Sequence, residues 1–114
     1  MNMSNSDSFN LFENPEDQKL ATLATSTLAR TGAKQAAALR DTTGRTYVAI
    51  NVESPGLSLD AFEAVLTVAL ASGITGIESV VATGDQPAHV AVIKDFAPTA
   101  TVFFINASGE EVLL

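Results

Sequence analysis

Three acidic side chains and one histidine stand near the starts of two predicted helices, and together they could bind a metal ion. Asp60 and Glu63 lie in the first turn of one predicted helix, whereas Asp85 and His89 lie close to the start of the next. Carboxylate oxygen and imidazole nitrogen are common metal ligands, and two helix N-termini facing one pocket would bring them together. The alternative is structural, because an Asp at a helix N-terminus complements the helix dipole and an isolated His is often a loop or capping residue.

The composition excludes several other kinds of chemistry. The 114 residues contain no cysteine, which excludes disulfides, thiolate nucleophiles and cysteine-based zinc or iron–sulfur sites. The glycines form no phosphate-binding loop, and Ser26, Ser54 and Ser58 lack the sequence context of a serine nucleophile. The net charge of -7 disfavours binding to nucleic acid or to an anionic membrane. No apolar run reaches membrane-spanning length and no leader pattern opens the chain, so we expect a cytoplasmic protein.

Basic side chains are concentrated near a predicted hairpin, at Arg30, Lys34, Arg40 and Arg45. Such a group could bind an anion or an acidic partner. Charges at the ends of hairpins and helices are also usual on a solvated surface, so both interpretations stay open.

The elements that must position these residues follow from apolar spacing and from start and stop signals. Asn14 and Pro15 begin a helix, and Gly32 ends it. Residues 35–40 and 45–52 are predicted to form the two strands of a hairpin. A second helix extends from a cap at Ser58 to about residue 72. A strand over residues 77–83, a short helix over 88–96 and a strand over 101–106 complete the prediction.

The order α, β, β, α, β, α, β predicts the α/β class, as a three-layer α/β/α sandwich with a mixed sheet. The last two strands should be parallel to each other and to the second hairpin strand. We expect one domain over residues 14–114, preceded by a flexible tail over residues 1–13. Within that tail Phe9, Leu11 and Phe12 are a small apolar anchor or, alternatively, a partner-docking segment. The second helix is apolar around nearly its whole circumference, which predicts a central helix or one in a subunit interface.

Several short motifs follow one another through the middle of the chain: residues 32–47, the triplet Asn51-Val52-Glu53, residues 57–63, and residues 95–98 with 101–102. In this order they resemble the cytidine deaminase family, over roughly residues 20–106. The resemblance implies the cytidine deaminase-like fold. In that family the Asn and Glu of an Asn-Val-Glu motif bind the ribose of a nucleoside, which makes Asn51 and Glu53 the candidate ligand-binding residues. Each could instead be an ordinary strand-end or turn residue.

The resemblance fails at the residues that perform the family's reaction. Cytidine deaminases hold zinc with one Cys or His at the start of the second helix and two Cys at the start of the third. The metal makes hydroxide from water, and a Glu transfers the protons. Here Asp60 replaces the first ligand and Phe62 replaces the proton-transferring Glu. The two Cys positions fall on Ala88 and Ala91 or, in an alternative alignment, on Gln86 and His89.

Neither alignment restores three ligands, so we predict a degenerate member with no catalytic residue, no metal and no cofactor. Glu63 is a poor substitute for the missing Glu, because one step along a helix turns a side chain by roughly 100°. A phenyl ring at Phe62 would fill the base pocket and keep it dry. Asp60 and His89 are the remaining candidates for a metal site.

The predicted function is therefore that of a catalytically degenerate scaffold, partner-binding or nucleoside-sensing protein. We expect a homodimer or homotetramer, because in the resembled family the region of the second helix packs between subunits. The alternative is an active cytidine or nucleoside deaminase, a hydrolase that uses zinc in an altered site. In either case we expect no nucleic-acid partner and no membrane association.

Overall fold

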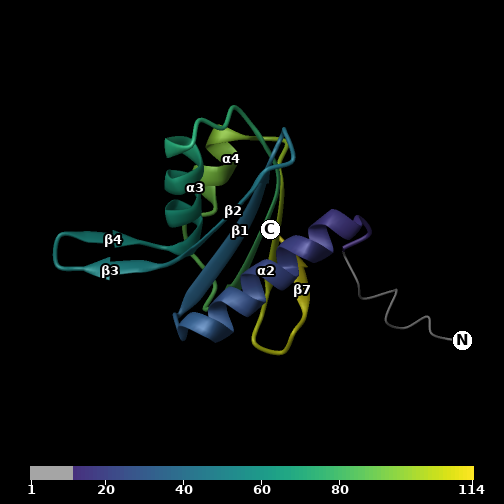
Figure 1. Cartoon of the computed structure of the whole chain (residues 1–114). Coiled ribbons are helices and arrows are strands. Elements are labelled where there is room, and N and C mark those ends of the chain that lie inside the picture. Colours follow the sequence, from purple (N-terminus) through teal and green to yellow (C-terminus); the bar gives the residue numbers. More distant parts are fainter. Residues whose placement is uncertain (1–11) are drawn as a thin grey trace, which may run out of the picture.

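A mixed five-stranded sheet lies at the centre of the computed structural model, which describes residues 12–114 (Figure 1). The strand order is β2-β1-β5-β6-β7. The strands are β1 (Gln35–Asp41), β2 (Thr46–Ile50), β5 (Ile77–Gly84), β6 (Thr101–Ile105) and β7 (Glu111–Leu113). β5 and β6 are parallel, and the other neighbours are antiparallel. Because β1 is antiparallel to both β2 and β5, these two strands point the same way, as predicted.

Helices cover both faces of this sheet (Figure 1). α2 (Pro15–Thr31) lies on one face, and α3 (Ala61–Ala71) and α4 (Ala91–Phe96) lie on the other. The α/β class and the three-layer sandwich with a mixed sheet are thus confirmed.

Local sequence signals explain the bounds of α2. The Asn14 side chain accepts a hydrogen bond from the backbone N–H of Glu16 at 2.9 Å, and Pro15 occupies the first helical position. Gly32 ends the helix with a φ of 67°, a left-handed conformation that glycine adopts without strain. Leu20 and Ala24 are buried against the sheet, so the small apolar face allows close packing.

The core is divided by the sheet into two clusters. The larger lies under α3 and α4, where Phe62, Val65 and Ile93 are fully buried. The smaller lies under α2 and includes Leu20 and Phe103. Fully burying a side chain of this size contributes about 1.5–3 kcal/mol, so the α3 side supplies most of the hydrophobic stabilisation.

Three details differ from the sequence-based prediction. Ser58 is not a helix cap, since it lies within a hairpin of β3 (Val52–Ser54) and β4 (Leu57–Leu59) that projects from the body (Figure 1). The cap of α3 is Asp60. α4 begins at residue 91 and not at residue 88, because residues 85–89 follow an irregular path before Val90 starts the turn.

The N-terminal end of the described residues bears on the prediction of a flexible tail. Phe12 was assigned to the tail, yet its ring is buried and contacts Phe103. Residues 1–11, with Phe9 and Leu11, lie outside the described residues, so the domain boundary at residue 14 stays a prediction.

Within residues 12–114, no helix is long and apolar enough to cross a membrane.

Candidate functional site

A capping box at the start of α3 is the centre of the candidate site. The Asp60 Oδ1 atom accepts the backbone N–H of Glu63 at 2.9 Å, and Glu63 Oε1 accepts the backbone N–H of Asp60 at 2.8 Å. Each carboxylate therefore satisfies a backbone N–H that lacks a partner within the helix. Such a cap stabilises a helix by about 1 kcal/mol.

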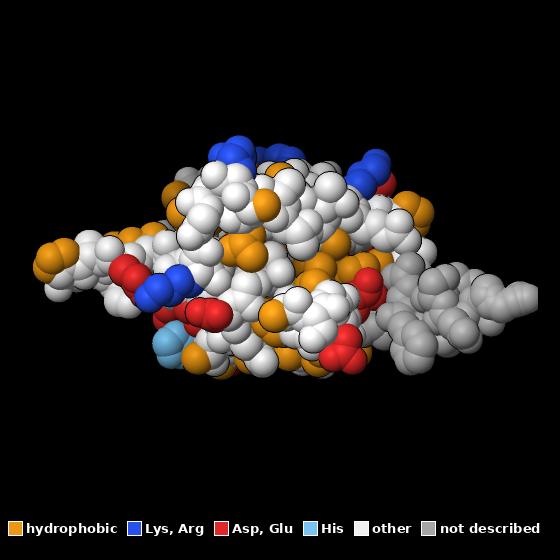
Figure 2. Space-filling view, turned by 90° about the horizontal axis from the view of Figure 1, so that it is seen from below, with side chains coloured by type: hydrophobic (Ala, Val, Ile, Leu, Met, Phe, Trp, Pro, Cys, Tyr) orange, Lys and Arg blue, Asp and Glu red, His pale blue; other side chains and the backbone are white. Residues whose placement is uncertain are grey.

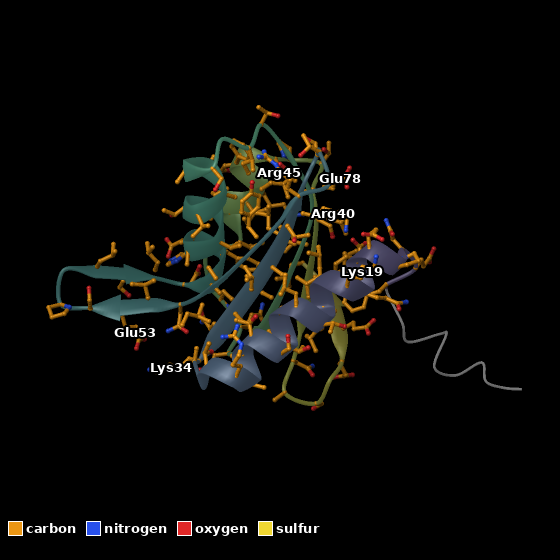
Figure 3. All side chains as sticks on the ribbon, viewed as in Figure 1. Lys19, Lys34, Arg40, Arg45, Glu53 and Glu78 are labelled. Atoms are coloured by element: carbon orange, nitrogen blue, oxygen red, sulfur yellow. The ribbon has the colours of Figure 1, made fainter. Side chains whose placement is uncertain are left out.

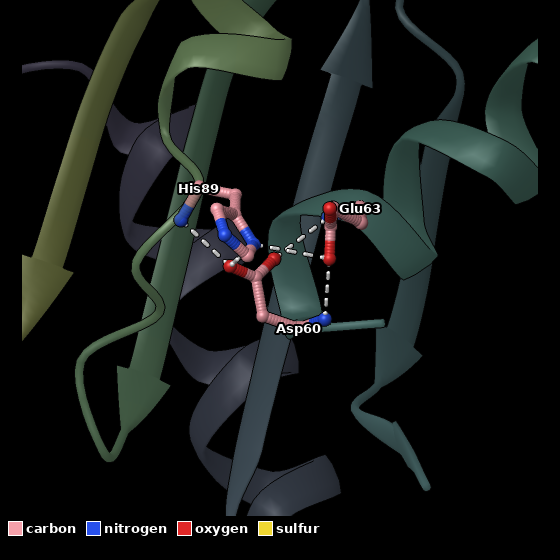
Figure 4. A group of neighbouring side chains, drawn as sticks. All are labelled: Asp60, Glu63 and His89. Atoms are coloured by element: carbon pink, nitrogen blue, oxygen red, sulfur yellow. Dashed lines mark hydrogen bonds and ion pairs between the residues drawn. The ribbon is translucent and has the colours of Figure 1, made fainter. Parts of the chain in front are cut away.

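His89 joins this capping box from the loop between β5 and α4 (Figure 4). Its backbone N–H donates to Asp60 Oδ2 at 2.7 Å. Its Nδ1 atom lies 3.2 Å from Asp60 Oδ2 and 3.2 Å from Glu63 Oε1. Possible ligand atoms of the three residues lie within 4.8 Å of one another. Asp85, the fourth metal candidate from the sequence, is exposed and lies outside this cluster.

A small cavity of about 150 Å³ opens beside the cluster. It lies where the hairpin of β3 and β4, the start of β1 and the N-terminus of α3 meet. Eight of its nine lining residues are polar by type, and the lining consists of Lys34, Gln35, Asn51, Glu53, Ser58, Leu59, Asp60, Glu63 and His89.

Gln35 connects the walls of this cavity, and sequence reasoning missed it. Its Oε1 atom accepts the backbone N–H of Ala61 at 3.0 Å, which satisfies a further N–H at the start of α3. Its own backbone N–H donates to Asn51 Oδ1 at 3.0 Å. One signal in the sequence was that β1 begins with a polar residue, Gln35, directly before four apolar residues. Its partner Ala61 is 26 positions away, however, so the contact could not be inferred from local pattern.

Both predicted ligand-binding residues, Asn51 and Glu53, line the cavity. Asn51 is half-buried, and its side-chain oxygen Oδ1 accepts a hydrogen bond from the backbone N–H of Gln35. Glu53 is exposed, and its Oε2 atom lies 3.5 Å from the Nζ atom of Lys34. Ligand binding by Asn51 and Glu53 stays a prediction.

The positions at which the resemblance predicted the missing catalytic Glu and the two Cys ligands lie outside the cavity lining, with the exception of His89. Phe62 is fully buried in the larger core cluster. Ala88 and Ala91 are exposed and carry no donor atom, and Gln86 is exposed and is not part of the cluster around Asp60. His89 is therefore the residue of this loop that reaches the site.

Most of the predicted basic group is engaged in ion pairs with acidic side chains of the same chain (Figure 3). Arg40 contacts Asp17 at 2.9 Å and Glu78 at 2.8 Å. Burial disfavours the charged guanidinium, but the attraction of Glu78 and Asp17 outweighs it and raises the pKa of Arg40. These contacts fasten α2 to β1, so Arg40 serves the fold.

Asp41 forms a second buried contact at the hairpin turn. Arg45 lies 2.9 Å from its Oδ2 atom, and the hydroxyl of Thr43 donates to its Oδ1 atom at 2.8 Å. Burial alone would raise the pKa of Asp41, but the hydrogen bonds from Thr43 and Arg45 outweigh it and lower the pKa to about 2. Asp41 thus stabilises the turn between β1 and β2 as a carboxylate.

Comparison with protein families matches residues 13–109 to the family described as Cytidine deaminase-like. Among solved structures, a cytidine deaminase from Burkholderia pseudomallei superposes with a TM-score of 0.73 at 23% identity, over 85% of this chain and 90% of that one. A cytidine deaminase from Mycobacterium leprae gives a TM-score of 0.63 at 16% identity, over 84% and 91% of the two chains. A search of curated proteins gives no match. At these identities the structures establish a shared fold.

Proposed function

The chain belongs to the cytidine deaminase-like family, and from that premise we propose that it is a non-catalytic member that binds a small polar ligand in the cavity beside α3. The observation that carries this proposal is the engagement of Asp60. Both of its carboxylate oxygens accept backbone N–H groups, one from Glu63 and one from His89. The residue at the family's first metal position thus fastens a loop to a helix.

The donor set fits a divalent metal ion in type but leaves no group to transfer protons. Asp60, Glu63 and His89 would hold such an ion, which when bound would supply an activated water. A zinc deaminase also needs a separate Glu that is not a ligand. If Asp60 and Glu63 both bound the metal, Glu53 would be the carboxylate that remains in the described lining of the cavity. Glu53 lies on the projecting hairpin, and its carboxylate is paired with the side chain of Lys34. Phe62, at the position of the family's Glu, is buried in the core.

The size and polarity of the cavity favour a ligand smaller than a whole nucleoside. Its 150 Å³ is about half of the roughly 300 Å³ at which ligand pockets usually begin. Glu53 can accept hydrogen bonds from hydroxyl groups, and Lys34 and Ser58 can donate them. We therefore expect a pentose, or the pentose end of a nucleoside, to enter while the base stays outside.

Calorimetric titration with cytidine and with ribose tests this proposal. We expect both ligands to bind with similar affinity, since the base contributes little, and binding to weaken at least tenfold in Glu53→Gln. Glu16→Gln is a matched control, because Glu16 is also exposed and paired with a lysine but lies on α2. Absence of binding, or binding that Glu53→Gln leaves unchanged, would contradict the proposal.

A second candidate function is a hydrolase with an altered metal site, and the spacing of the three ligand atoms favours it. Equilibrium dialysis against zinc followed by elemental analysis decides between the two. About one zinc per chain, lost in His89→Ala, would support this alternative. Zinc far below one per chain would support the non-catalytic proposal.

We also propose that the chain forms a homodimer or homotetramer through the outer face of α3. Val68 and Leu70 are each 45% exposed, although a helix surface in water is usually polar. They are two positions apart and so lie roughly 160° from each other, at opposite edges of the exposed side of α3. Burying such side chains in a partner would contribute about 25 cal/mol per Å² of apolar area.

A further inference from the structure

β2 forms one edge of the five-stranded sheet, and its outer side pairs with no strand of residues 12–114. The hydrogen bonds that flank β2 show which of its backbone groups face β1. The N–H of Asp41 donates to the carbonyl of Arg45 at 2.8 Å. The N–H of Asn51 donates to the carbonyl of Gln35 at 3.3 Å. Hydrogen-bonded and non-bonded pairs alternate along an antiparallel ladder, so the odd-numbered residues of β2 bond to β1. The backbone N–H and C=O groups that point outward belong to Thr46, Val48 and Ile50.

This edge lacks the features that keep sheet edges from pairing with a further strand. Such edges are usually short, charged, bulged or interrupted by proline. β7, at the other end of the sheet, has three residues and begins with Glu111. β2 has five residues with no charge and no proline, and its register with β1 is continuous. Charged side chains stand at several places on another face of the molecule (Figure 2), so the uncharged β2 edge is a local feature.

We propose that the β2 edges of two copies of this chain pair antiparallel about a twofold axis at Val48, which joins the two sheets into one. The proposal rests on the oligomer proposed above and names its contact. This register places Thr46 opposite the partner's Ile50, so every outward N–H and C=O of both strands gains a hydrogen bond. A twofold axis at Tyr47 would leave Ile50 unpaired within β2, and one at Ala49 would leave Thr46 unpaired.

The side chains of β2 fit the same register. Tyr47 and Ala49 pack against the larger core cluster, and Val48 packs against the smaller one. The ring of Tyr47 would lie opposite the partner's Ala49, and Thr46 opposite the partner's Ile50, so a larger side chain meets a smaller one in each pair. Since each copy carries a net charge of -7, an uncharged edge also allows two copies to approach with little repulsion.

α3 would take part in the same interface. It packs on both β1 and β2, with α4 beside it (Figure 1). Because paired strands lie about 4.8 Å apart, two α3 helices centred between β1 and β2 would lie about 10 Å apart, a usual spacing for packed helices. Val68 and Leu70 lie at opposite edges of the exposed side of α3, so one of them lies on the side of the partner's helix. The strand edge and the exposed apolar helix thus form one interface.

Amide hydrogen exchange at increasing protein concentration tests this pairing. The amides of Tyr47 and Ala49 are bonded to β1 and should be protected at every concentration. The amides of Thr46, Val48 and Ile50 should exchange fast in the monomer. We expect their exchange to slow at least tenfold at concentrations where analytical ultracentrifugation shows an oligomer.

The other outcomes separate this proposal from the one on which it rests. An oligomer in which these three amides stay unprotected would overturn pairing of the β2 edges and leave the proposed oligomer standing. A chain that is monomeric at all concentrations would overturn both, and would leave the edge to another partner or to none.

A proline variant tests the pairing without disturbing the ladder to β1. Thr46→Pro removes an outward N–H, and an edge strand tolerates proline where its N–H faces solvent. We expect the dissociation constant of the oligomer to rise at least tenfold. Ala107→Pro is the matched control, because Ala107 is also exposed and is the second residue of a turn closed by the bond from the Gly109 N–H to the Asn106 carbonyl at 2.9 Å. With both variants folded by circular dichroism, an unchanged dissociation constant in Thr46→Pro, or an equal rise in Ala107→Pro, would contradict the proposal.

Discussion

Replacing Phe62 by Glu introduces a carboxylate where the resemblance predicts the family's proton-transferring Glu, and the burial of Phe62 predicts that this change strongly destabilises the protein. The Phe62 side chain has no exposed surface and packs in the larger core cluster. Removing a buried Phe costs about 3–5 kcal/mol. A carboxylate left in that space adds a desolvation cost of several kcal/mol, or must be protonated. We expect the free energy of unfolding to fall by at least about 4 kcal/mol, against a total of roughly 5–15 kcal/mol for a domain.

Urea denaturation followed by circular dichroism measures this effect. With a slope of about 1–3 kcal/mol per molar urea, the midpoint should shift by roughly 2 M, or the variant should be unfolded without denaturant. Thr22→Glu is the matched control, because it places the same carboxylate in a helix at an exposed position, away from the proposed subunit interface. It should change the free energy of unfolding by no more than about 0.5 kcal/mol. If Phe62→Glu were as stable as Thr22→Glu, position 62 would face solvent as in an active site, and the reasoning would be refuted.

Three other predictions concern the cap, the acid range and the assembly. Asp60→Ala should lower the free energy of unfolding by about 1–2 kcal/mol in urea denaturation. Asp60→Ser should recover the capping part of that loss, because Ser also caps helices. An unchanged free energy of unfolding in Asp60→Ala would contradict the capping role. The Asp41 carboxyl has a pKa of about 2 in the folded chain against 3.8 for an unperturbed group, so its contribution is present above pH 4 and is lost as the pH falls toward 2. Denaturation at a series of pH values should give a smaller decrease across this range in Asp41→Asn, and an unchanged decrease would refute the assignment. Val68→Glu should convert the proposed oligomer to a monomer in analytical ultracentrifugation; a parent chain that is monomeric at micromolar concentration would remove the basis of that proposal.

Much of the fold was predictable because its signals are local. The cap at Asn14 and the left-handed Gly32 delimit α2 within a few residues of chain, and both occur as predicted. The short helix predicted between β5 and β6 implied a crossover and therefore a parallel pair, which the register confirms. Each of these predictions used only local signals and the order of the elements, so no knowledge of tertiary contacts was needed.

The start of α3 was mispredicted because two capping signals compete there. Ser58 and Asp60 can both cap a helix, but only Asp60 is followed three residues later by a Glu that completes a capping box. The hairpin of β3 and β4 was also missed. Its strands have three residues each, too few for alternation to be recognised, although Pro55-Gly56 is a turn signal.

The candidate site could be predicted only in part, since its contacts are long-range. The sequence points to Asp60 and His89 together, but their contact depends on the path of residues 85–90, which no sequence pattern determines. Glu63 was treated as a poor replacement for a catalytic Glu. In the structure it caps α3 and contacts His89.

We propose that this chain, with its deaminase fold, carries out no deamination, and an ultraviolet assay with cytidine tests that proposal. The purified chain, in molar excess over cytidine and supplied with zinc, is followed by ultraviolet absorbance beside an active cytidine deaminase. We expect the absorbance of cytidine to stay constant over hours with this chain and to fall with the active enzyme. A decrease that scales with the amount of this chain and disappears in His89→Ala would refute the proposal and would indicate a working metal site at Asp60, Glu63 and His89.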